Sequence, residues 1–159
     1  MALKNVQKAG PNYVPAYQVS GVPFVTSSHG DDVLSLNQSG RNHLRVRKIE
    51  FPYATRWIEI KNTTDGGSVS PGSKPKLRIA FTMSGTFSET EMPNDISSRN
   101  YFLLEPSGST GRWEIRCKEV FFASDGPTSA GFSMIAGLTG IPRSEFPVIT
   151  ASNGFAGVG

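Results

Sequence analysis

Alternating hydrophobic and polar residues dominate the middle of the chain. In KLRIAF (76–81), Leu77, Ile79 and Phe81 share one side of an extended chain, and the basic Arg78 lies on the other side. A period of two residues is typical of a β-strand with one buried and one exposed face. The pattern therefore predicts a strand here, with Arg78 on its solvent face.

Similar patterns recur along the chain. TRWIEIK (55–61) places Ile58 and Ile60 on one face and Trp57 on the other. RWEIRCKEVFF (112–122) is predicted as one strand with three inward residues, Trp113, Ile115 and Cys117. HLRVRKIEF (43–51) changes parity at Ile49 and Phe51, which indicates a bulge or a bend. Four further strands are predicted in VPFVTS (22–27), VLSL (33–36), NYFLLE (100–105) and AGFSMIAGLT (130–139).

Helical patterns are short. The best candidate is FSETEMPNDISSRN (87–100), and Pro93 interrupts it. About eight strands separated by polar turns predict an all-β protein, an antiparallel β-sandwich with the strand count of a jelly roll. The alternation alone leaves an immunoglobulin-like topology open, although no Cys…Trp…Cys spacing supports it.

Composition indicates one domain of 159 residues with 18% charged residues, 17 glycines and 11 prolines. The net charge of +3 is mild, and the most basic stretch, RNHLRVRK (41–48), alternates like a strand, so nucleic-acid binding is not expected. A single cysteine, Cys117, excludes an intrachain disulfide and is expected to be a small buried residue. Neither a secretion signal nor a membrane span is expected from the sequence.

Candidate chemistry is sparse. His29, Asp31 and Asp32 in SSHGDD could ligate a divalent cation, because imidazole and carboxylate groups both suit one, but an exposed turn has the same composition. No nucleophile elbow or phosphate-binding loop is present. We therefore predict no catalytic residues, no metal and no cofactor. A cation-dependent activity at these three residues is the remaining enzymatic hypothesis.

Both ends of the chain are poor in charge and rich in proline and apolar residues. We divide the chain into an N-terminal arm (1–20), a sandwich (21–140) and a C-terminal arm (141–159). Extended apolar arms need a surface to bury against, either an edge of their own sheet or a neighbouring subunit. The predicted interaction residues are Tyr13, Tyr17, Trp57, Phe146, Ile149 and Phe155.

A resemblance follows from YQVSGVPFVTS, FPYATRWIEI, LRIAFT, NYFLLEPSGSTGRWEIRCKEVFF and the ending LTGIPRSEFPVITASNGFAGVG. Together they resemble the single jelly-roll capsid proteins that form the fivefold vertices, or pentons, of large icosahedral double-stranded DNA viruses. The resemblance implies a virion structural protein without chemistry, a homo-oligomer (a pentamer) that contacts other capsid proteins. A capsid decoration protein of a tailed phage and a carbohydrate-binding sandwich module are the alternatives.

Overall fold

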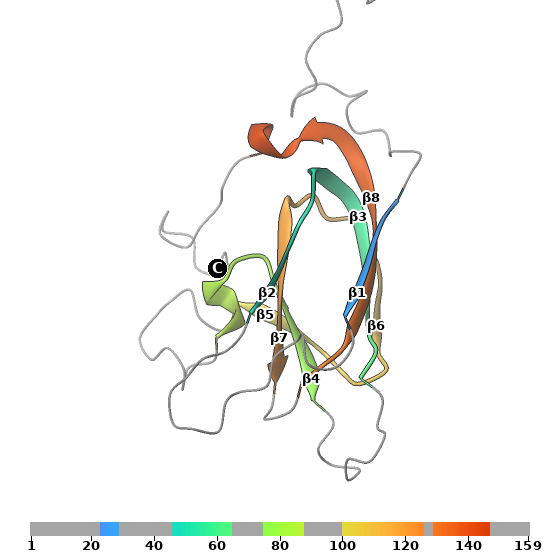
Figure 1. The fold of residues 1–159 in the computed structure, drawn as a ribbon, viewed down its shortest axis with the longest axis vertical. Helices are drawn as coiled ribbons and strands as arrows, with labels where there is room; N and C mark the ends of the chain where they lie inside the picture. The colour runs from blue at the N-terminus through green and yellow to red at the C-terminus, as the bar shows by residue number, and fades with distance from the viewer. Residues whose placement is uncertain (1–22, 29–45, 65–74, 88–99, 126–128, 147–159) are drawn as a thin grey trace, which may run out of the picture.

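A computed structural model of the chain describes residues 23–28, 46–64, 75–87, 100–125 and 129–146. Figure 1 shows two β-sheets packed face to face, with short 3-10 helices at their periphery. In the described residues no helix is long and apolar enough to cross a membrane. The predicted strand 33–36 and most of the candidate helix 87–100 lie outside the described residues.

Each sheet has four strands. The first sheet has the order β1-β8-β3-β6, formed by β1 (Phe24–Ser28), β8 (Phe132–Pro142), β3 (Tyr53–Asn62) and β6 (Ser109–Trp113). The second sheet has the order β2-β7-β4-β5, formed by β2 (Arg47–Glu50), β7 (Glu119–Asp125), β4 (Lys76–Ala80) and β5 (Tyr101–Leu104).

This strand order is that of a jelly roll. The pairs β1–β8, β2–β7, β3–β6 and β4–β5 are all antiparallel neighbours, as if one long hairpin were rolled into a sandwich. Two further antiparallel pairs, β3–β8 and β4–β7, join these hairpin pairs within each sheet. The predicted all-β jelly roll of eight strands is therefore confirmed.

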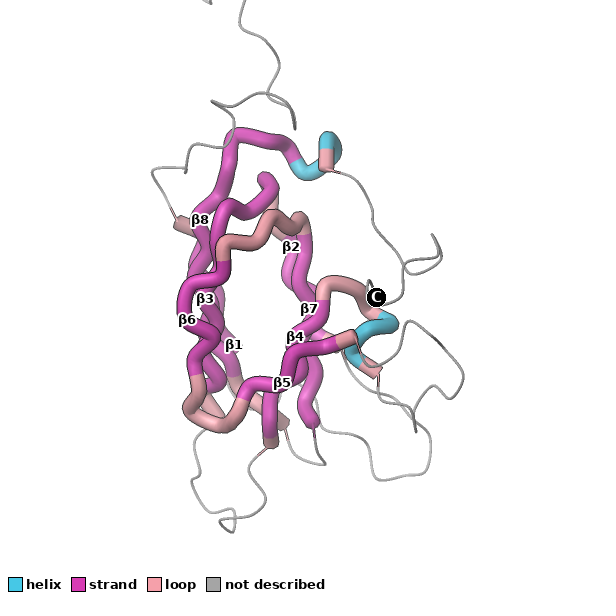
Figure 2. The backbone as a smooth tube through the Cα atoms, turned by 180° about the vertical axis from the view of Figure 1, so that it is seen from behind, coloured by secondary structure: helices cyan, strands magenta, loops and turns pink. Residues whose placement is uncertain are grey.

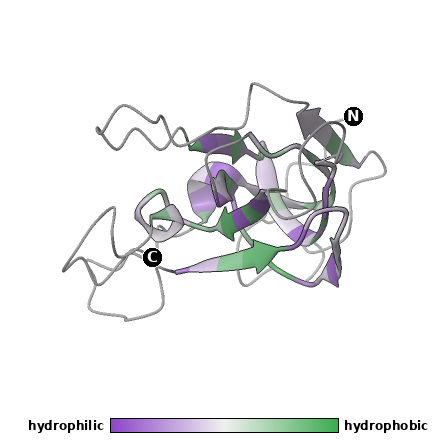
Figure 3. Ribbon diagram, turned by 90° about the horizontal axis from the view of Figure 1, so that it is seen from below, coloured by the Kyte–Doolittle hydropathy of each residue, from purple (hydrophilic) through white to green (hydrophobic). Residues whose placement is uncertain are grey.

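The core lies between the sheets and consists of aliphatic and aromatic side chains. Phe122 of the second sheet stacks on Phe132 of the first, with ring centroids 4.2 Å apart. Figure 3 shows hydrophobic and hydrophilic segments within the same ribbons, as alternation predicts. The expected core positions Ile58, Ile60, Leu77, Ile79 and Cys117 are buried, whereas Phe81, Trp113 and Ile115 are only partly buried against this core.

The segment 112–122 is not one strand, contrary to the sequence prediction. β6 ends at Trp113, residues 114–118 cross from the first sheet to the second, and β7 begins at Glu119. Buried Thr55 holds this crossing, because its hydroxyl donates to the carbonyl of Ile115 (2.7 Å) and accepts from the amide of Cys117 (2.9 Å). Alternation continues across the crossing, which is why it could not reveal where the strand ends.

The chain bends between β2 and β3, at Phe51 and Pro52. The parity change noted in the sequence lies earlier, between Val46 and Ile49, and Leu44 on its other side lies outside the described residues. β2 ends at Glu50 in the second sheet, and β3 begins at Tyr53 in the first sheet. The amide of Phe51 donates to the carbonyl of Lys118 (2.9 Å). The two places where the chain changes sheets are thus hydrogen-bonded to each other at one end of the sandwich.

Arg78 is buried, so its predicted position on a solvent face is wrong. The outer face of β4 is covered in part by the 3-10 helix η3 (Ser84–Thr86), which contacts β4 and β7. Arg78 donates from Nη1 to the carbonyl of Thr86 (3.0 Å) and from Nη2 to Asp125 Oδ1 (2.6 Å). Both faces of β4 are therefore enclosed, and a buried cation is tolerated because it is paired and hydrogen-bonded.

β8 extends beyond residue 140, where the sequence analysis placed the boundary of the C-terminal arm. Ile141 is fully buried, and Pro142 ends the strand. The 3-10 helix η4 (Arg143–Glu145) follows. The amide of Arg143 donates to the carbonyl of Pro52 (3.3 Å), so η4 is attached to the bend between β2 and β3.

Candidate interaction surface

The flank between edge strands β5 and β6 contains an open apolar groove of about 420 Å³. Figure 2 looks at this flank, with β6 on one side and β5 on the other. Its apolar lining is Ile79, Phe81, Phe102, Trp113 and Ile115, and its polar lining is Asn100, Arg112 and Glu114.

Two aromatic rings meet across the groove, one from each sheet. Phe102 and Trp113 have centroids 5.0 Å apart and planes at 89°, the edge-to-face arrangement that aromatic pairs prefer. Phe102 belongs to the edge strand β5 and is 50% exposed. The pair therefore links the sheets and leaves apolar ring surface facing solvent.

The charged residues at the rim of the groove neutralise each other. Arg112 Nε lies 2.8 Å from Glu114 Oε1, and both side chains are exposed. The guanidinium of Arg112 also lies over the ring of Trp57, 4.9 Å from its centroid. The groove thus presents an apolar floor and a rim without net charge.

Trp57 lies on the outer face of the first sheet, as its parity predicted, and is partly buried. Its indole occupies the space beside Gly137 in which any side chain at that position would lie. Arg112 contacts the ring as well. The indole is therefore packed against its own domain rather than presented as an open aromatic platform.

A network of four charged side chains lies at the β2 edge. This four-charge network consists of Lys48, Glu50, Glu119 and Arg143. Lys48 Nζ lies 2.7 Å from Glu50 Oε1 and 3.0 Å from Glu119 Oε2, and Arg143 Nη2 lies at the same two distances from the same two atoms. Hydrogen bonds from Arg143 and then Lys48 lower the pKa of Glu50 to about 2. The two cations hold together two carboxylates that face each other across β2 and β7.

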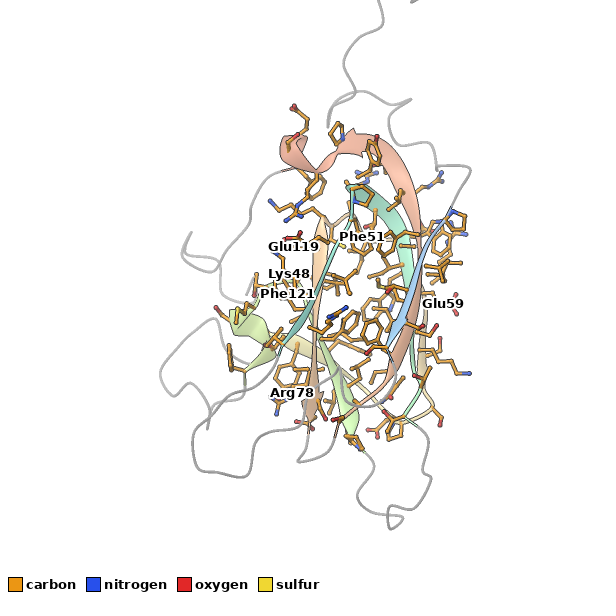
Figure 4. All side chains as sticks on the ribbon, viewed as in Figure 1. Lys48, Phe51, Glu59, Arg78, Glu119 and Phe121 are labelled. Atoms are coloured by element: carbon orange, nitrogen blue, oxygen red, sulfur yellow. The ribbon has the colours of Figure 1, made fainter. Side chains whose placement is uncertain are left out.

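Figure 4 shows how these groups are distributed on the two sheets. Phe51 points between the sheets, whereas Lys48, Phe121 and Arg78 lie on the outer side of the second sheet. Arg78 also stacks over Tyr101 of β5, 4.9 Å from the ring centroid. Buried Arg78, paired with Asp125, therefore supports β5 from the face opposite the groove.

Among the predicted interaction residues, Trp57 and Phe146 are described. Phe146 is partly buried and lines a cavity of about 550 Å³ with Pro52, Lys118, Pro142, Arg143 and Ser144. The candidate cation ligands His29, Asp31 and Asp32 lie outside the described residues, as do the remaining arm residues Tyr13, Tyr17, Ile149 and Phe155. Trp57 and Phe146 are not brought together in either of these two pockets.

The one cysteine has no nucleophilic character. Burial raises the pKa of the Cys117 thiol to about 11, so it stays protonated at neutral pH. Within the described ranges, no three His, Cys, Asp or Glu residues gather as they would around a metal ion.

Sequence reasoning did not identify the groove. The available signal was YFLL (101–104), four consecutive apolar residues without alternation, which indicates apolar side chains on both faces of a strand. Periodicity did not show that this strand lies at an edge, because edge position depends on how distant segments pair. Comparison with family models, curated proteins and solved structures finds no match to this chain.

Proposed function

We propose that this protein is a structural subunit of a virus particle, a single jelly-roll capsid protein that acts by associating with copies of itself. The observation that carries the proposal is the uncovered aromatic flank, where half of the Phe102 surface faces solvent beside an apolar groove. Exposed apolar surface of this kind, bordered by polar residues, is typical of protein interaction sites.

The fold alone would not select this function, since jelly rolls also occur in lectins and cupins. In this sandwich the space between the sheets is filled by core side chains, including the stacked Phe122 and Phe132. On the outer face, the ring of Trp57 is contacted by Arg112 and lies against Gly137, which disfavours the carbohydrate-binding alternative. Within the described residues, the groove is an open apolar surface, and it favours association with protein.

The vertex role in a double-stranded DNA virus rests on the sequence resemblance together with this jelly-roll order. An edge strand with unpaired main-chain groups favours pairing with another chain. A heterologous contact between such subunits forms a ring when its rotation closes. Five copies around an axis, joined to other capsid proteins, are the arrangement that we propose.

The test is the assembly state of the purified full chain. Mass photometry and light scattering over a range of concentrations should give a closed oligomer, and electron microscopy should show fivefold rings. Closed oligomers of another symmetry would retain a structural role and favour the decoration-protein alternative. A chain that stays monomeric at every concentration would contradict the proposal.

A further inference from the structure

Of the two edges that border the groove, β5 has neither a charged residue nor an irregular register. Its four residues, Tyr101–Leu104, are apolar, and its only hydrogen-bonded strand neighbour among the described residues is β4. The β2 edge carries Arg47, Lys48 and Glu50. Charged residues blunt an edge, whereas an apolar edge with free main-chain groups accepts another strand.

The β6 edge, on the other side of the groove, is irregular. Its pairing with β3 shifts register between Glu59 and Lys61, and Gly111 has a φ of +64°. A bulge twists an edge strand away from further pairing. An added strand on this flank is therefore expected on β5, with every second side chain directed toward the groove.

The chemistry of the groove defines what it can bind. Its floor is aromatic and aliphatic, and Arg112 and Glu114 at the rim are paired with each other. A charged segment would gain nothing from this rim and would lose hydration. The groove thus fits an uncharged, extended polypeptide with β-branched or aromatic side chains.

We propose that residues 147–159 of a second copy of this chain bind along β5, with the apolar side chains of one strand face in the groove. PVITASNGFAGVG carries no Asp, Glu, Lys, Arg or His side chain, and it offers Val148, Ile149 and Phe155. After Pro147 it has no proline, so every later residue can donate a main-chain hydrogen bond. Residues 1–22 fit less well, because they contain Lys4, Lys8, Pro11 and Pro15.

Length and position allow this segment to reach a neighbouring subunit. The described chain reaches Phe146 just after η4, which lies at the opposite end of the sandwich from β5 in Figure 2. Thirteen residues (147–159) span at most about 45 Å when extended, and pairing with a four-residue edge uses about 13 Å of that length. Enough chain is left to reach an adjacent subunit. This inference rests on the self-association proposed above.

The experiment uses two variants that each remove one half of the contact. The chain truncated after Phe146 keeps the groove and loses the segment, and Phe102→Glu keeps the segment and places a charge in the groove. Val25→Glu is the matched control, because Val25 is a 64% exposed strand residue on the first sheet. Circular dichroism establishes that all three variants are folded.

Each of the two variants alone should be monomeric by mass photometry, and Val25→Glu should assemble like the natural chain. Mixed in equal amounts, the truncated chain and Phe102→Glu should form a 1:1 heterodimer, because the mixture contains one intact groove and one intact segment per pair. A synthetic peptide of residues 147–159 should bind the truncated chain. Introducing Phe102→Glu into the truncated chain should weaken this binding by more than about tenfold.

The outcomes separate the two proposals. If Phe102→Glu assembles normally, or if the mixture stays monomeric, the docking inference is overturned and the structural role still stands. If the natural chain does not associate at all, the structural role fails, and docking between copies fails with it.

Discussion

Each flank of the sandwich contains an edge-to-face pair of aromatic rings, but the two pairs differ in solvent exposure. On the β1–β2 flank, which faces the viewer in Figure 1, Phe24 and Phe51 meet edge to face at 5.1 Å and 76°. On the β5–β6 flank, Phe102 and Trp113 meet at 5.0 Å and 89°. Each pair joins one sheet to the other, yet Phe51 is 1% exposed and Phe102 is 50% exposed.

The neighbouring residues explain this difference. Phe51 lies at the bend between β2 and β3, where its amide donates a hydrogen bond to the carbonyl of Lys118. The four-charge network of β2, β7 and η4 lies close by. Phe102 lies in the middle of an apolar edge strand beside the open groove. The first flank is closed by its own chain, and the second has surface available to another chain. Aromatic pairing therefore sets the distance between the sheets, and the surrounding segments decide which rings are covered.

The largest expected effect is a difference in the free energy of unfolding between substitutions of Phe51 and of Phe102. Phe51→Ala should lower the free energy of unfolding by about 3–5 kcal/mol, as other buried Phe→Ala changes do. Phe102→Ala should lower it by only about 1 kcal/mol, because it loses mainly the edge-to-face contact. Urea unfolding of dilute protein, where association is absent, measures both values. Equal losses would contradict the distinction between a closed and an open flank.

The second prediction concerns the support behind the open flank. Asp125→Asn should cost about 2–4 kcal/mol, because it removes the carboxylate that is paired with the buried Arg78 guanidinium; the side chains of Arg78 and Asp125 are 5% and 31% exposed. The partial exposure of Asp125 keeps the expected loss below that of a fully buried pair.

Glu105→Gln is the matched control, because it removes an exposed pair between Lys76, which like Arg78 is in β4, and Glu105, which follows β5. It should cost less than about 1 kcal/mol. Chemical denaturation of both variants gives the comparison. If Asp125→Asn costs no more than the control, Arg78 does not hold the outer face of the second sheet.

The contrast between flanks also shows which features of the fold could be predicted from the sequence. Alternation in segments such as KLRIAF predicted the strands. Alternation could not divide 112–122, since the crossing residues 114–118 keep the period of a strand. The predicted exposure of Arg78 was wrong because its burial depends on η3 and Asp125. Alternation within the strand of Arg78 carries no information about either partner. The open flank was missed for a similar reason: edge position follows from long-range pairing.

The third prediction tests the rim of the open flank. Gly137→Ala places a methyl group where Trp57 Nε1 lies, so the indole must move, and Arg112 with it. The expected loss is about 1–3 kcal/mol, the usual cost of overpacking. Trp57→Ala removes the obstacle, so Gly137→Ala should cost less in that background. The double-mutant cycle measures this coupling, and strictly additive losses would show that Trp57 does not pack on Gly137.

The smallest expected effect lies at the closed flank and depends on pH. The pKa of Glu50 is about 2 in the folded chain against 4.5 for an unperturbed glutamate, because Arg143 and Lys48 donate hydrogen bonds to it. A carboxyl whose pKa falls on folding stabilises the folded state above its unfolded pKa, and this contribution is lost as the pH falls from about 4.5 toward 2. Glu50→Gln should therefore flatten the fall of the melting temperature over that range. Because these side chains are exposed, the difference between the natural chain and Glu50→Gln should shrink between about 0.01 M and about 1 M salt, as the screening length falls from about 30 to about 3 Å. Thermal melts of both chains across this pH range at the two salt concentrations measure it. An unchanged acid dependence in Glu50→Gln would show that the four-charge network does not contribute to closing the β1–β2 flank, and the difference between the flanks would then rest on apolar packing alone.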